Sequence, residues 1–321
     1  NENPYPPSEK IKEAMSEIKN LRKYPDPAAT KLVEAIASYH GFDKEEVFVG
    51  VGSDDVLAVA FMTFFNGKKP IFFPDITYSF YPVWAELFGI PYEKKAVNDA
   101  FEIQKEDYYA ENGGVVFPNP NAPTGAFLSL EVVEDIIQHN QDVVVIVDEA
   151  YIDFGGDTAK ELTRKYDNVL VVQTYSKSRS LAGLRIGYAI GNKELIKAMN
   201  DVKYSYNSYT MNEPSIVLGT AVLEDEEYFQ ETRNKIIDTR EWFQIEMRKI
   251  GFSFADSKAN FIFATHESVP AKEIFEAAKK AKIYVRYFDQ PRINNYLRIT
   301  IGTREEMETL LDFLKEFTAT K

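Results

Sequence analysis

The stretch Val143-Val144-Val145-Ile146-Val147-Asp148-Glu149-Ala150-Tyr151 joins five β-branched apolar residues to an abrupt polar end. A short, continuous apolar run of this kind is typical of a strand that is buried on both faces of a sheet. Comparable runs recur along the chain, separated by segments with helical periodicity; they lie at residues 47–49, 70–73, 115–117, 169–172 and 186–190. This alternation predicts an α/β fold in which helices flank a mostly parallel sheet.

The pattern changes near residue 224, which indicates a second domain. A long charged helical stretch runs to about residue 250, and shorter strand and helix patterns follow it. We expect strands at 261–264, 283–286 and 296–301, and helices that start at Ala271 and Thr303. Near the N-terminus, Ser8 is a candidate helix cap, and Asp26-Pro27 is expected to open a helix that ends near Gly41. We therefore predict a large domain at 21–222, a smaller α+β domain at 223–321, and an N-terminal segment 1–20 near the active site.

Composition excludes several classes of function. The 321-residue chain is 45% hydrophobic and carries 37 basic against 50 acidic residues, a net charge of -13 that argues against nucleic-acid or anionic-membrane binding. No apolar run reaches membrane-spanning length and no signal-peptide pattern is seen, so we expect a cytoplasmic protein. The absence of Cys excludes thiolate catalysis, and three scattered His residues argue against a His triad or a multi-His metal site.

Asp148 ends the run quoted above, and its position matters more than its residue type. Ligands of open α/β sheets bind outside the carboxyl ends of the strands, which is where Asp148 falls. A carboxylate there can pair with a ring nitrogen and keep it protonated, so that a cofactor acts as an electron sink. A helix cap or an edge acid explains the same residue equally well.

A second loop with polar residues follows the strand at 169–172. Its sequence, Gln173-Thr174-Tyr175-Ser176-Lys177-Ser178-Arg179-Ser180-Leu181-Ala182-Gly183-Leu184-Arg185, offers hydroxyls, a lysine amine and guanidinium groups. These groups can grip a phosphate and supply an amine for covalent catalysis. Taken alone, a loop lysine such as Lys177 is more often simply solvated.

Two further loops also follow predicted strands. Gly50-Val51-Gly52-Ser53-Asp54 precedes an apolar helical segment, so its backbone N–H groups and the helix dipole could bind a phosphate, although it lacks the P-loop spacing. Pro118-Asn119-Pro120-Asn121-Ala122-Pro123-Thr124-Gly125 is dense in turn formers and predicts a rigid corner that can hold a cis proline.

In this order, the four loops resemble the fold-type I pyridoxal-phosphate-dependent aminotransferases over nearly the whole chain. Segments 1–8, 24–26, 176–183 and 285–300 resemble the histidinol-phosphate aminotransferase family most closely. The resemblance implies a fold-type I architecture, pyridoxal 5'-phosphate as cofactor, and a homodimer. It also implies the reversible conversion of histidinol phosphate and 2-oxoglutarate to imidazole-acetol phosphate and glutamate, in histidine biosynthesis.

The resemblance assigns a role to each cofactor-site residue. Lys177 holds the cofactor as a Schiff base and later moves a proton, Asp148 pairs with the pyridine nitrogen, and Tyr151 bonds the phenolic oxygen. Tyr78 lies against the ring face, although by residue type alone it would be core packing. The implied phosphate contacts are Ser53, Asp54, Thr174, Ser176 and Arg185.

One position departs from the family pattern. The family usually carries Asn directly before Pro-Thr-Gly, whereas Ala122 stands there in this chain and Asn121 precedes it. We predict that Asn121 takes the place of that residue and contacts the phenolic oxygen.

Four more residues concern the substrate and the neighbouring subunit. Arg286 and Arg298 match positions that bind substrate anions, since paired guanidinium groups accept a phosphate or a carboxylate. Without the resemblance they would be exposed sheet-edge charges. Tyr5 resembles a substrate-pocket residue, and Tyr24 one that reaches the neighbouring subunit's cofactor phosphate.

Three other functions remain open from the sequence. An aromatic amino-acid aminotransferase and a threonine-phosphate decarboxylase would share Lys177, Asp148 and Arg185. A cofactor-binding regulator without turnover would use the same fold for a different purpose.

Overall fold

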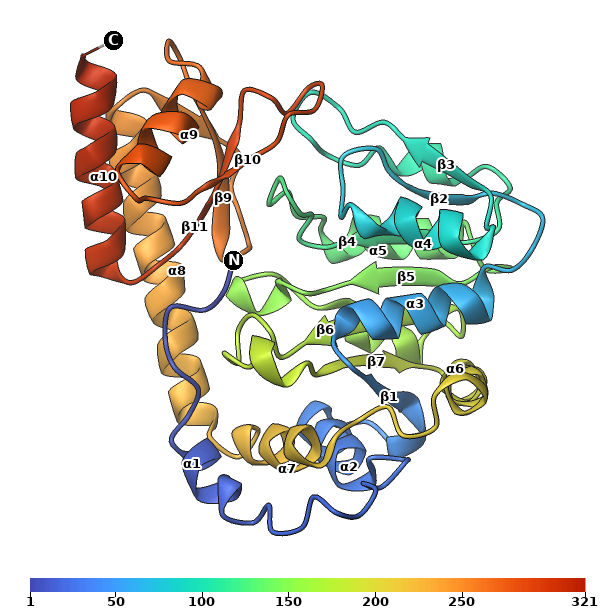
Figure 1. Cartoon of the computed structure of the whole chain (residues 1–321). Coiled ribbons are helices and arrows are strands. Elements are labelled where there is room, and N and C mark those ends of the chain that lie inside the picture. The colour runs from blue at the N-terminus through green and yellow to red at the C-terminus, as the bar shows by residue number, and fades with distance from the viewer. Residues whose placement is uncertain (321) are drawn as a thin grey trace.

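Two sheets organise the computed structural model, which describes residues 1–320 (Figure 1). The larger sheet has seven strands in the order β1-β7-β6-β5-β4-β2-β3. Their bounds are β1 Val47–Gly50, β2 Ile71–Pro74, β3 Tyr92–Lys95, β4 Val115–Pro118, β5 Val145–Asp148, β6 Val169–Thr174 and β7 Gly187–Gly191. β7 pairs antiparallel with both of its neighbours, and the other pairings in this sheet are parallel. The predicted mostly parallel sheet is confirmed.

The two faces of the large sheet bury alternate residues of the same strands. Val145 and Val147 of β5 pack in one apolar cluster with α5 (Leu130–Gln138), whereas Ile146 packs in another cluster on the opposite face. That second cluster includes α3 (Ser53–Phe64), α4 (Phe80–Phe88) and α6 (Lys193–Tyr206). Figure 1 shows α3 and α4 crossing in front of the strands. Burial on both faces explains why these strands are continuous apolar runs.

Three helices cover the β1 edge of the sheet. They are α1 (Lys10–Met15), α2 (Thr30–His40) and α7 (Glu213–Val222), whose apolar side chains pack with those of β1 and β7. α2 ends at Gly41 as predicted, but it begins at Thr30 rather than at Pro27. The Asp26 carboxylate accepts hydrogen bonds from the backbone N–H groups of Ala28 and Thr30, which holds residues 26–29 in a turn before the helix.

The predicted cap of the first helix is one residue off. Glu9, not Ser8, is the N-cap of α1. The Ser8 hydroxyl accepts a hydrogen bond from the Lys10 N–H and also donates to Asp225, the N-cap of α8 (Glu226–Lys249), so Ser8 ties the N-terminal segment to the start of that helix.

The smaller sheet has four antiparallel strands in the order β10-β11-β9-β8. Its elements are α8 Glu226–Lys249, β8 Phe252–Phe254, β9 Phe261–His266, α9 Ala271–Lys280, β10 Arg286–Tyr287, β11 Leu297–Thr300 and α10 Arg304–Ala319. Short 3-10 helices complete the fold: η1 Lys44–Glu46, η2 Lys105–Tyr108, η3 Ile152–Phe154, η4 Ala159–Arg164 and η5 Ala182–Leu184. Among residues 1–320, no helix is both long and apolar enough to cross a membrane.

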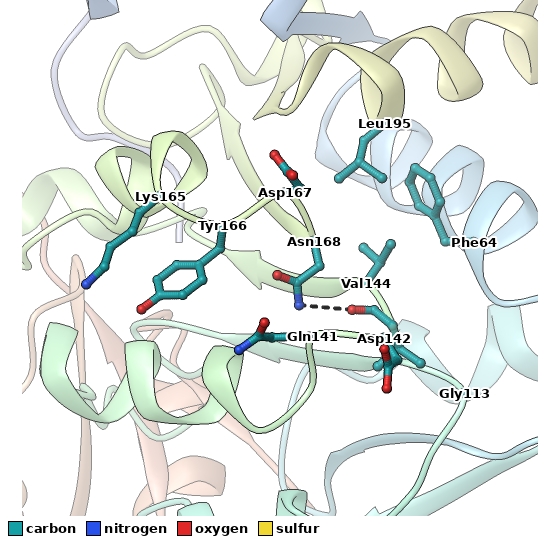
Figure 2. Close-up of a pocket in the computed structure, with 11 residues that line it drawn as sticks. Phe64, Gly113, Gln141, Asp142, Val144, Lys165, Tyr166, Asp167, Asn168 and Leu195 are labelled. Carbon is teal, nitrogen blue, oxygen red and sulfur yellow. Dashed lines mark hydrogen bonds between the residues drawn. The ribbon is translucent and has the colours of Figure 1, made fainter.

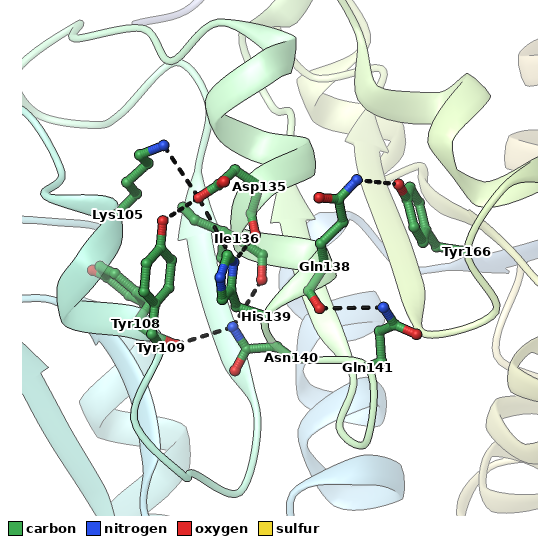
Figure 3. Close-up of polar contacts among 10 residues, drawn as sticks. All are labelled: Lys105, Tyr108, Tyr109, Asp135, Ile136, Gln138, His139, Asn140, Gln141 and Tyr166. Carbon is green, nitrogen blue, oxygen red and sulfur yellow. Dashed lines mark hydrogen bonds and ion pairs between the residues drawn. The ribbon is translucent and has the colours of Figure 1, made fainter.

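Polar contacts fix the loop that precedes β4 at the end of the sheet where α5 terminates (Figure 3). The buried Asn140 amide donates to the backbone oxygens of Tyr108 and Ile136, at 3.0 and 2.8 Å. The His139 ring stacks on Tyr109 with 3.7 Å between ring centroids. These contacts satisfy a buried amide and anchor η2 against α5.

Candidate active site

A cavity of about 610 Å³ lies at the carboxyl ends of the strands of the large sheet and reaches the small sheet. It collects most of the predicted site residues: Ser53, Asp54, Tyr78, Asp148, Tyr151, Thr174, Ser176, Lys177, Arg185, Arg286 and Arg298. These side chains come from strands, helix starts and loops of both sheets, and the first and last of them are more than 200 residues apart in sequence. The topology of the sheet therefore gathers the groups that the sequence placed at successive strand ends.

Asp148 is a buried carboxylate at the end of β5. It accepts hydrogen bonds from the Tyr81 hydroxyl at 2.8 Å and from the Ala150 N–H at 3.3 Å. Burial raises the pKa of Asp148 to about 6, and these two hydrogen bonds oppose the rise. A positively charged group that lies beside this carboxylate would restore its full ionisation, so the position suits a protonated ring nitrogen.

Lys177 presents its amine to the same cavity, with Nζ 5.4 Å from the centre of the Tyr151 ring. Burial, and then the positive charge of Arg298, lowers the pKa of the Lys177 amine to about 8. A lowered amine pKa increases the neutral, nucleophilic fraction near neutral pH. Lys177 is therefore suited to form a covalent bond with a carbonyl group.

The two tyrosines of the cavity keep their protons. Burial raises the pKa of Tyr151 to about 12, so its hydroxyl is available as a hydrogen-bond donor at neutral pH. Burial and the nearby Asp54 carboxylate raise the pKa of Tyr78, whose hydroxyl donates to Asp54 at 2.8 Å. The Tyr78 ring packs with Phe80, Tyr81 and Trp84, which holds it as a rigid wall.

A tight cradle forms where the turn before α3 meets the start of β7. Gly52 has φ +84°, and a Cβ atom there would lie 2.6 Å from Nη2 of Arg185. A Cβ on Gly187 would lie 2.3 Å from the backbone N of Ser53. Only glycine allows this close approach, which places the N-terminus of α3 beside a guanidinium group.

Hydroxyl groups form another side of this cradle. The Thr174 hydroxyl donates to the Ser176 hydroxyl at 3.0 Å, and both residues line the cavity beside Arg185. Arg185 lies 3.5 Å from the Asp54 carboxylate, its ion-pair partner. Hydroxyls, a helix N-terminus and a guanidinium are the donors that a phosphate dianion requires.

The two arginines of the small sheet are direct neighbours. Arg286 of β10 lies opposite Arg298 of β11 in the antiparallel register, and both line the cavity. Burial lowers the pKa of Arg298, and Arg286 lowers it further. Within residues 1–320, the buried Nε of Arg298 has no hydrogen-bond partner. A buried donor beside a second positive charge suits an anionic ligand.

These features fit the cofactor that the sequence suggested. A buried carboxylate suits a ring nitrogen, a lysine amine is available for an aldehyde, and the turn at Gly52 and Ser53 lines the cavity beside the donors that a phosphate needs. Lys177 and Asp148 would hold the ring, and Arg185 with the Ser53 turn would hold the phosphate.

Three predicted residues lie outside the lining of this cavity. Asn121 donates through its amide to the Ile76 oxygen at 3.0 Å and to the Thr124 hydroxyl at 2.9 Å, and Ala122 lines the cavity instead. Tyr5 packs beside the core of the small sheet and under the Lys235 amine. Tyr24 is 81% exposed and stacks on Tyr209, with ring centroids 4.6 Å apart. Both peptide bonds before Pro120 and Pro123 are cis, as the turn sequence allowed.

Sequence reasoning missed two residues that support the cavity. Tyr81 lies in the first turn of α4, whereas Tyr78 precedes that helix, and no pattern in the sequence placed Tyr81 beside Asp148. Asn3 donates to the backbone oxygens of Lys177 and Ser178, at 3.0 and 3.1 Å, and so anchors the N-terminal segment to the lysine loop. The sequence carried no signal for this long-range contact.

A second cavity, of about 540 Å³, lies between α6 and the loops that lead into β5 and β6 (Figure 2). Its lining includes Asp142, Lys165, Tyr166 and Asn168. Lys165 and Tyr166 both contact the Glu134 carboxylate, and Asn168 donates to the Val143 oxygen at 3.1 Å. It lies at the amino ends of the strands, away from the end where ligands of such sheets bind.

Comparisons with known proteins agree with this geometry. The model of the family described as aminotransferase class I and II matches residues 1–314. A histidinol-phosphate aminotransferase of Lactococcus lactis subsp. cremoris (strain MG1363) is 50% identical over 323 residues, covering 100% of this chain and 91% of the relative. One from Clostridium botulinum (strain Okra / Type B1) is 51% identical over 318 residues, covering 98% of this chain and 90% of the relative.

Solved structures show the same fold. The histidinol-phosphate aminotransferase of Clostridium acetobutylicum superimposes with a TM-score of 0.91 at 23% identity, covering 100% of this chain and 98% of that one. The Sinorhizobium meliloti enzyme, solved in complex with pyridoxal-5'-phosphate, gives a TM-score of 0.89 at 21% identity, with coverages of 100% and 90%. At these identities the structural likeness establishes the fold alone.

Proposed function

Because this chain belongs to the class I and II aminotransferase family, we propose that it is a pyridoxal-phosphate-dependent transaminase that takes histidinol phosphate as amino donor. The second substrate is 2-oxoglutarate, and the products are imidazole-acetol phosphate and glutamate. The observation that supports the activity most strongly is that the Lys177 amine and the buried Asp148 carboxylate line the same cavity. The choice of substrate is supported by relatives of that name at about 50% identity over the whole chain. As an enzyme of histidine biosynthesis it is expected to act in the cytoplasm.

The cofactor, when bound, supplies a conjugated ring that accepts the electron pair released at the amino-bearing carbon of the substrate. Asp148 favours the positive charge on the ring nitrogen, and Tyr81 orients that carboxylate through its hydrogen bond. Lys177 holds the cofactor and is the amine placed to take or return the substrate proton. Tyr151 donates a hydrogen bond to the phenolic oxygen, and Tyr78 covers one side of the cavity.

Binding at the phosphate end of the cofactor falls to the glycine cradle. The donors are the backbone N–H groups of Ser53 and Asp54, the hydroxyls of Thr174 and Ser176, and the Arg185 guanidinium.

Asn121 is retained as a second contact to the phenolic oxygen, which requires its amide to turn away from the Ile76 oxygen. Tyr5 is proposed to contact the substrate from the N-terminal segment. The division into domains at 21–222 and 223–321 remains part of this proposal.

Arg286 and Arg298 serve the anionic groups of both substrates. A pair of guanidinium groups can receive the phosphate of histidinol phosphate in one half-reaction and a carboxylate of 2-oxoglutarate in the other. The phosphate carries more charge than a carboxylate, so it gains more from the second arginine.

Arg286→Ala should therefore raise the KM for histidinol phosphate by about tenfold or more, and that for glutamate by less. Steady-state assays in each direction, with glutamate as product or as donor, measure both values on one preparation. An equal rise in KM for the two substrates would contradict the proposal that Arg286 serves the phosphate more than the carboxylate.

A homodimer is also part of the proposal. Tyr24 is 81% exposed and contacts Tyr209, which is 45% exposed; Leu21 and Tyr206, close to these two in the sequence, are 68% and 70% exposed. Exposed apolar and aromatic side chains gathered in this way favour an interface with another protein surface. The Tyr24 hydroxyl would then reach the cofactor phosphate of the partner subunit.

Tyr24→Phe removes that hydroxyl and keeps the ring that stacks on Tyr209. Titration of the protein with pyridoxal phosphate should show an affinity lowered by about tenfold, without a change of oligomeric state in sedimentation. A monomeric wild-type protein that binds cofactor normally would rule out the contact between subunits.

A further inference from the structure

Arg292 forms polar contacts that join the small sheet to the large sheet at the mouth of the active-site cavity. Its Nη1 donates to the Asp75 carboxylate at 3.0 Å, and its Nη2 donates to the backbone oxygens of Val97 and Asn98 at 2.7 and 3.0 Å. Arg292 has φ +69°, in the left-handed region, which a residue other than glycine adopts at a cost. Three hydrogen bonds to groups far away in the sequence hold it there.

The partners of Arg292 are themselves joined. Asp75 follows β2, and its second carboxylate oxygen accepts a hydrogen bond from the Val97 N–H at 2.9 Å. Val97 lies just beyond the edge strand β3, so a single guanidinium ties together the loops that leave two neighbouring strands of the large sheet, β2 and β3. Figure 1 shows the orange-red loop between β10 and β11 meeting the loop that follows β3.

Apolar packing surrounds this polar contact. Ile76, Val97 and Phe101 from the large sheet's loops form one buried cluster with Phe263 and Ile293 from the small sheet. Asp75, Ile76 and Ile293 also line the active-site cavity, whereas Arg292 itself does not. The contact therefore lies directly behind the wall of the site.

The loop that Arg292 anchors connects the two strands that carry the substrate-binding arginines. β10 ends at Tyr287 and β11 starts at Leu297, so residues 288–296 form the tip of the hairpin on which Arg286 and Arg298 lie side by side. A shift of this tip would move both guanidinium groups relative to Lys177 on the large sheet. Misplacement of a binding group by about 1 Å can cost two orders of magnitude in rate.

We propose that Arg292 is a positioning residue: its clamp on Asp75, Val97 and Asn98 sets the distance between the substrate-anion arginines and the catalytic lysine. This inference rests on the proposed function and extends it to a residue that touches neither substrate nor cofactor. Because Arg292 holds the β10–β11 hairpin, we expect it to affect the binding of anionic substrates and not the binding of the cofactor.

Two variants separate the effect of the three Arg292 hydrogen bonds from the effect of its positive charge. Arg292→Ala removes both, whereas Arg292→Lys keeps the charge but cannot reach three acceptors with a planar fork. Both variants should raise the KM for histidinol phosphate and for 2-oxoglutarate by about tenfold, with kcat changed much less and cofactor affinity unchanged. Arg248→Ala is the matched control, because Arg248 is also a small-domain arginine in an ion pair, with Asp256, and is half exposed.

Amide hydrogen exchange supplies a measurement that does not depend on turnover. Peptides that cover residues 287–297 should exchange faster in both Arg292 variants than in the wild type, and those of β5 and β6 should not. Wild-type KM values in Arg292→Lys, or unchanged exchange in the hairpin, would overturn the proposal. The substrate assignment can fail separately. If the wild type does not use histidinol phosphate but the hairpin of the Arg292 variants still exchanges faster, the proposed substrate is wrong and the role of Arg292 stands.

Discussion

Lys177→Ala is expected to abolish transamination and to remove the near-ultraviolet or visible absorption of the lysine-bound cofactor. In the proposed mechanism the amine supplies both the covalent bond to the cofactor and the proton transfer at the substrate carbon, and loss of a general base alone costs up to about 10⁴-fold in rate. Absorption spectra and steady-state rates on the purified variant measure the two effects separately.

A matched control for this variant is Lys165→Ala. Lys165 is 61% exposed, pairs with Glu134 and lines the second cavity at the other end of the sheet. Its removal should leave the spectrum and the rate unchanged. Full activity in Lys177→Ala would eliminate the assignment of the catalytic lysine, whatever the spectrum showed.

Asp148→Asn should lower kcat/KM by about 10²–10³-fold, because a neutral amide no longer favours a positive charge on the ring nitrogen. The Tyr81 hydroxyl can still donate to the Asn oxygen, so the pocket should keep its shape. Kinetics with saturating cofactor measure this loss of rate. Asp142→Asn is the control, since Asp142 is an exposed acid that lines the second cavity.

Asp148→Asn should also change the free energy of unfolding of the cofactor-free protein. Burial raises the pKa of Asp148 from 3.8 to about 6, so the folded state binds more protons than the unfolded state between these pH values. The stability of the wild type therefore falls as the pH rises through this window, and above pH 6 the charged carboxylate costs about 3 kcal/mol. Urea unfolding should find Asp148→Asn more stable than the wild type at pH 7, with the difference shrinking toward pH 4. A difference that does not depend on pH would contradict this view of Asp148.

The sequence predicted the large sheet well because its strands are buried on both faces. Val143 to Val147 form a continuous apolar run for that reason, and β5 occupies the second half of it. Strand β3 was missed because Tyr92-Glu93-Lys94-Lys95 forms an exposed edge, where polar side chains replace the apolar pattern. The start of α2 was placed too early because the Asp26 carboxylate holds a turn that residue type alone does not distinguish from a first helical turn.

The candidate site was predictable wherever a residue follows a strand directly. Asp148, Lys177 and Arg185 lie at strand ends or in the loops between them, and the sheet brings them together. Tyr81 and Arg292 were not predictable, because a helix and a hairpin loop bring them to their partners Asp148 and Asp75 through tertiary packing. Such contacts between distant segments leave no periodic pattern in the sequence.

Two predicted contacts, those of Tyr24 and Asn121, are with groups outside this chain. Tyr24 is exposed in a single chain, and its predicted contact belongs to a partner subunit. The Asn121 amide donates to the Ile76 oxygen in a neighbouring loop and to the Thr124 hydroxyl in its own turn, so its contact to the cofactor remains a prediction.

The most direct test of the proposed function is a titration of the cofactor-loaded enzyme with one amino donor at a time and no acceptor. Histidinol phosphate should discharge the absorption of the lysine-bound cofactor in stoichiometric amounts, and 2-oxoglutarate should restore it with release of glutamate. Phenylalanine and threonine phosphate, the donors of the related activities, should act far more weakly. If histidinol phosphate leaves the absorption unchanged while phenylalanine or threonine phosphate discharges it, the proposed substrate is wrong; if no donor does, the protein binds its cofactor without turnover.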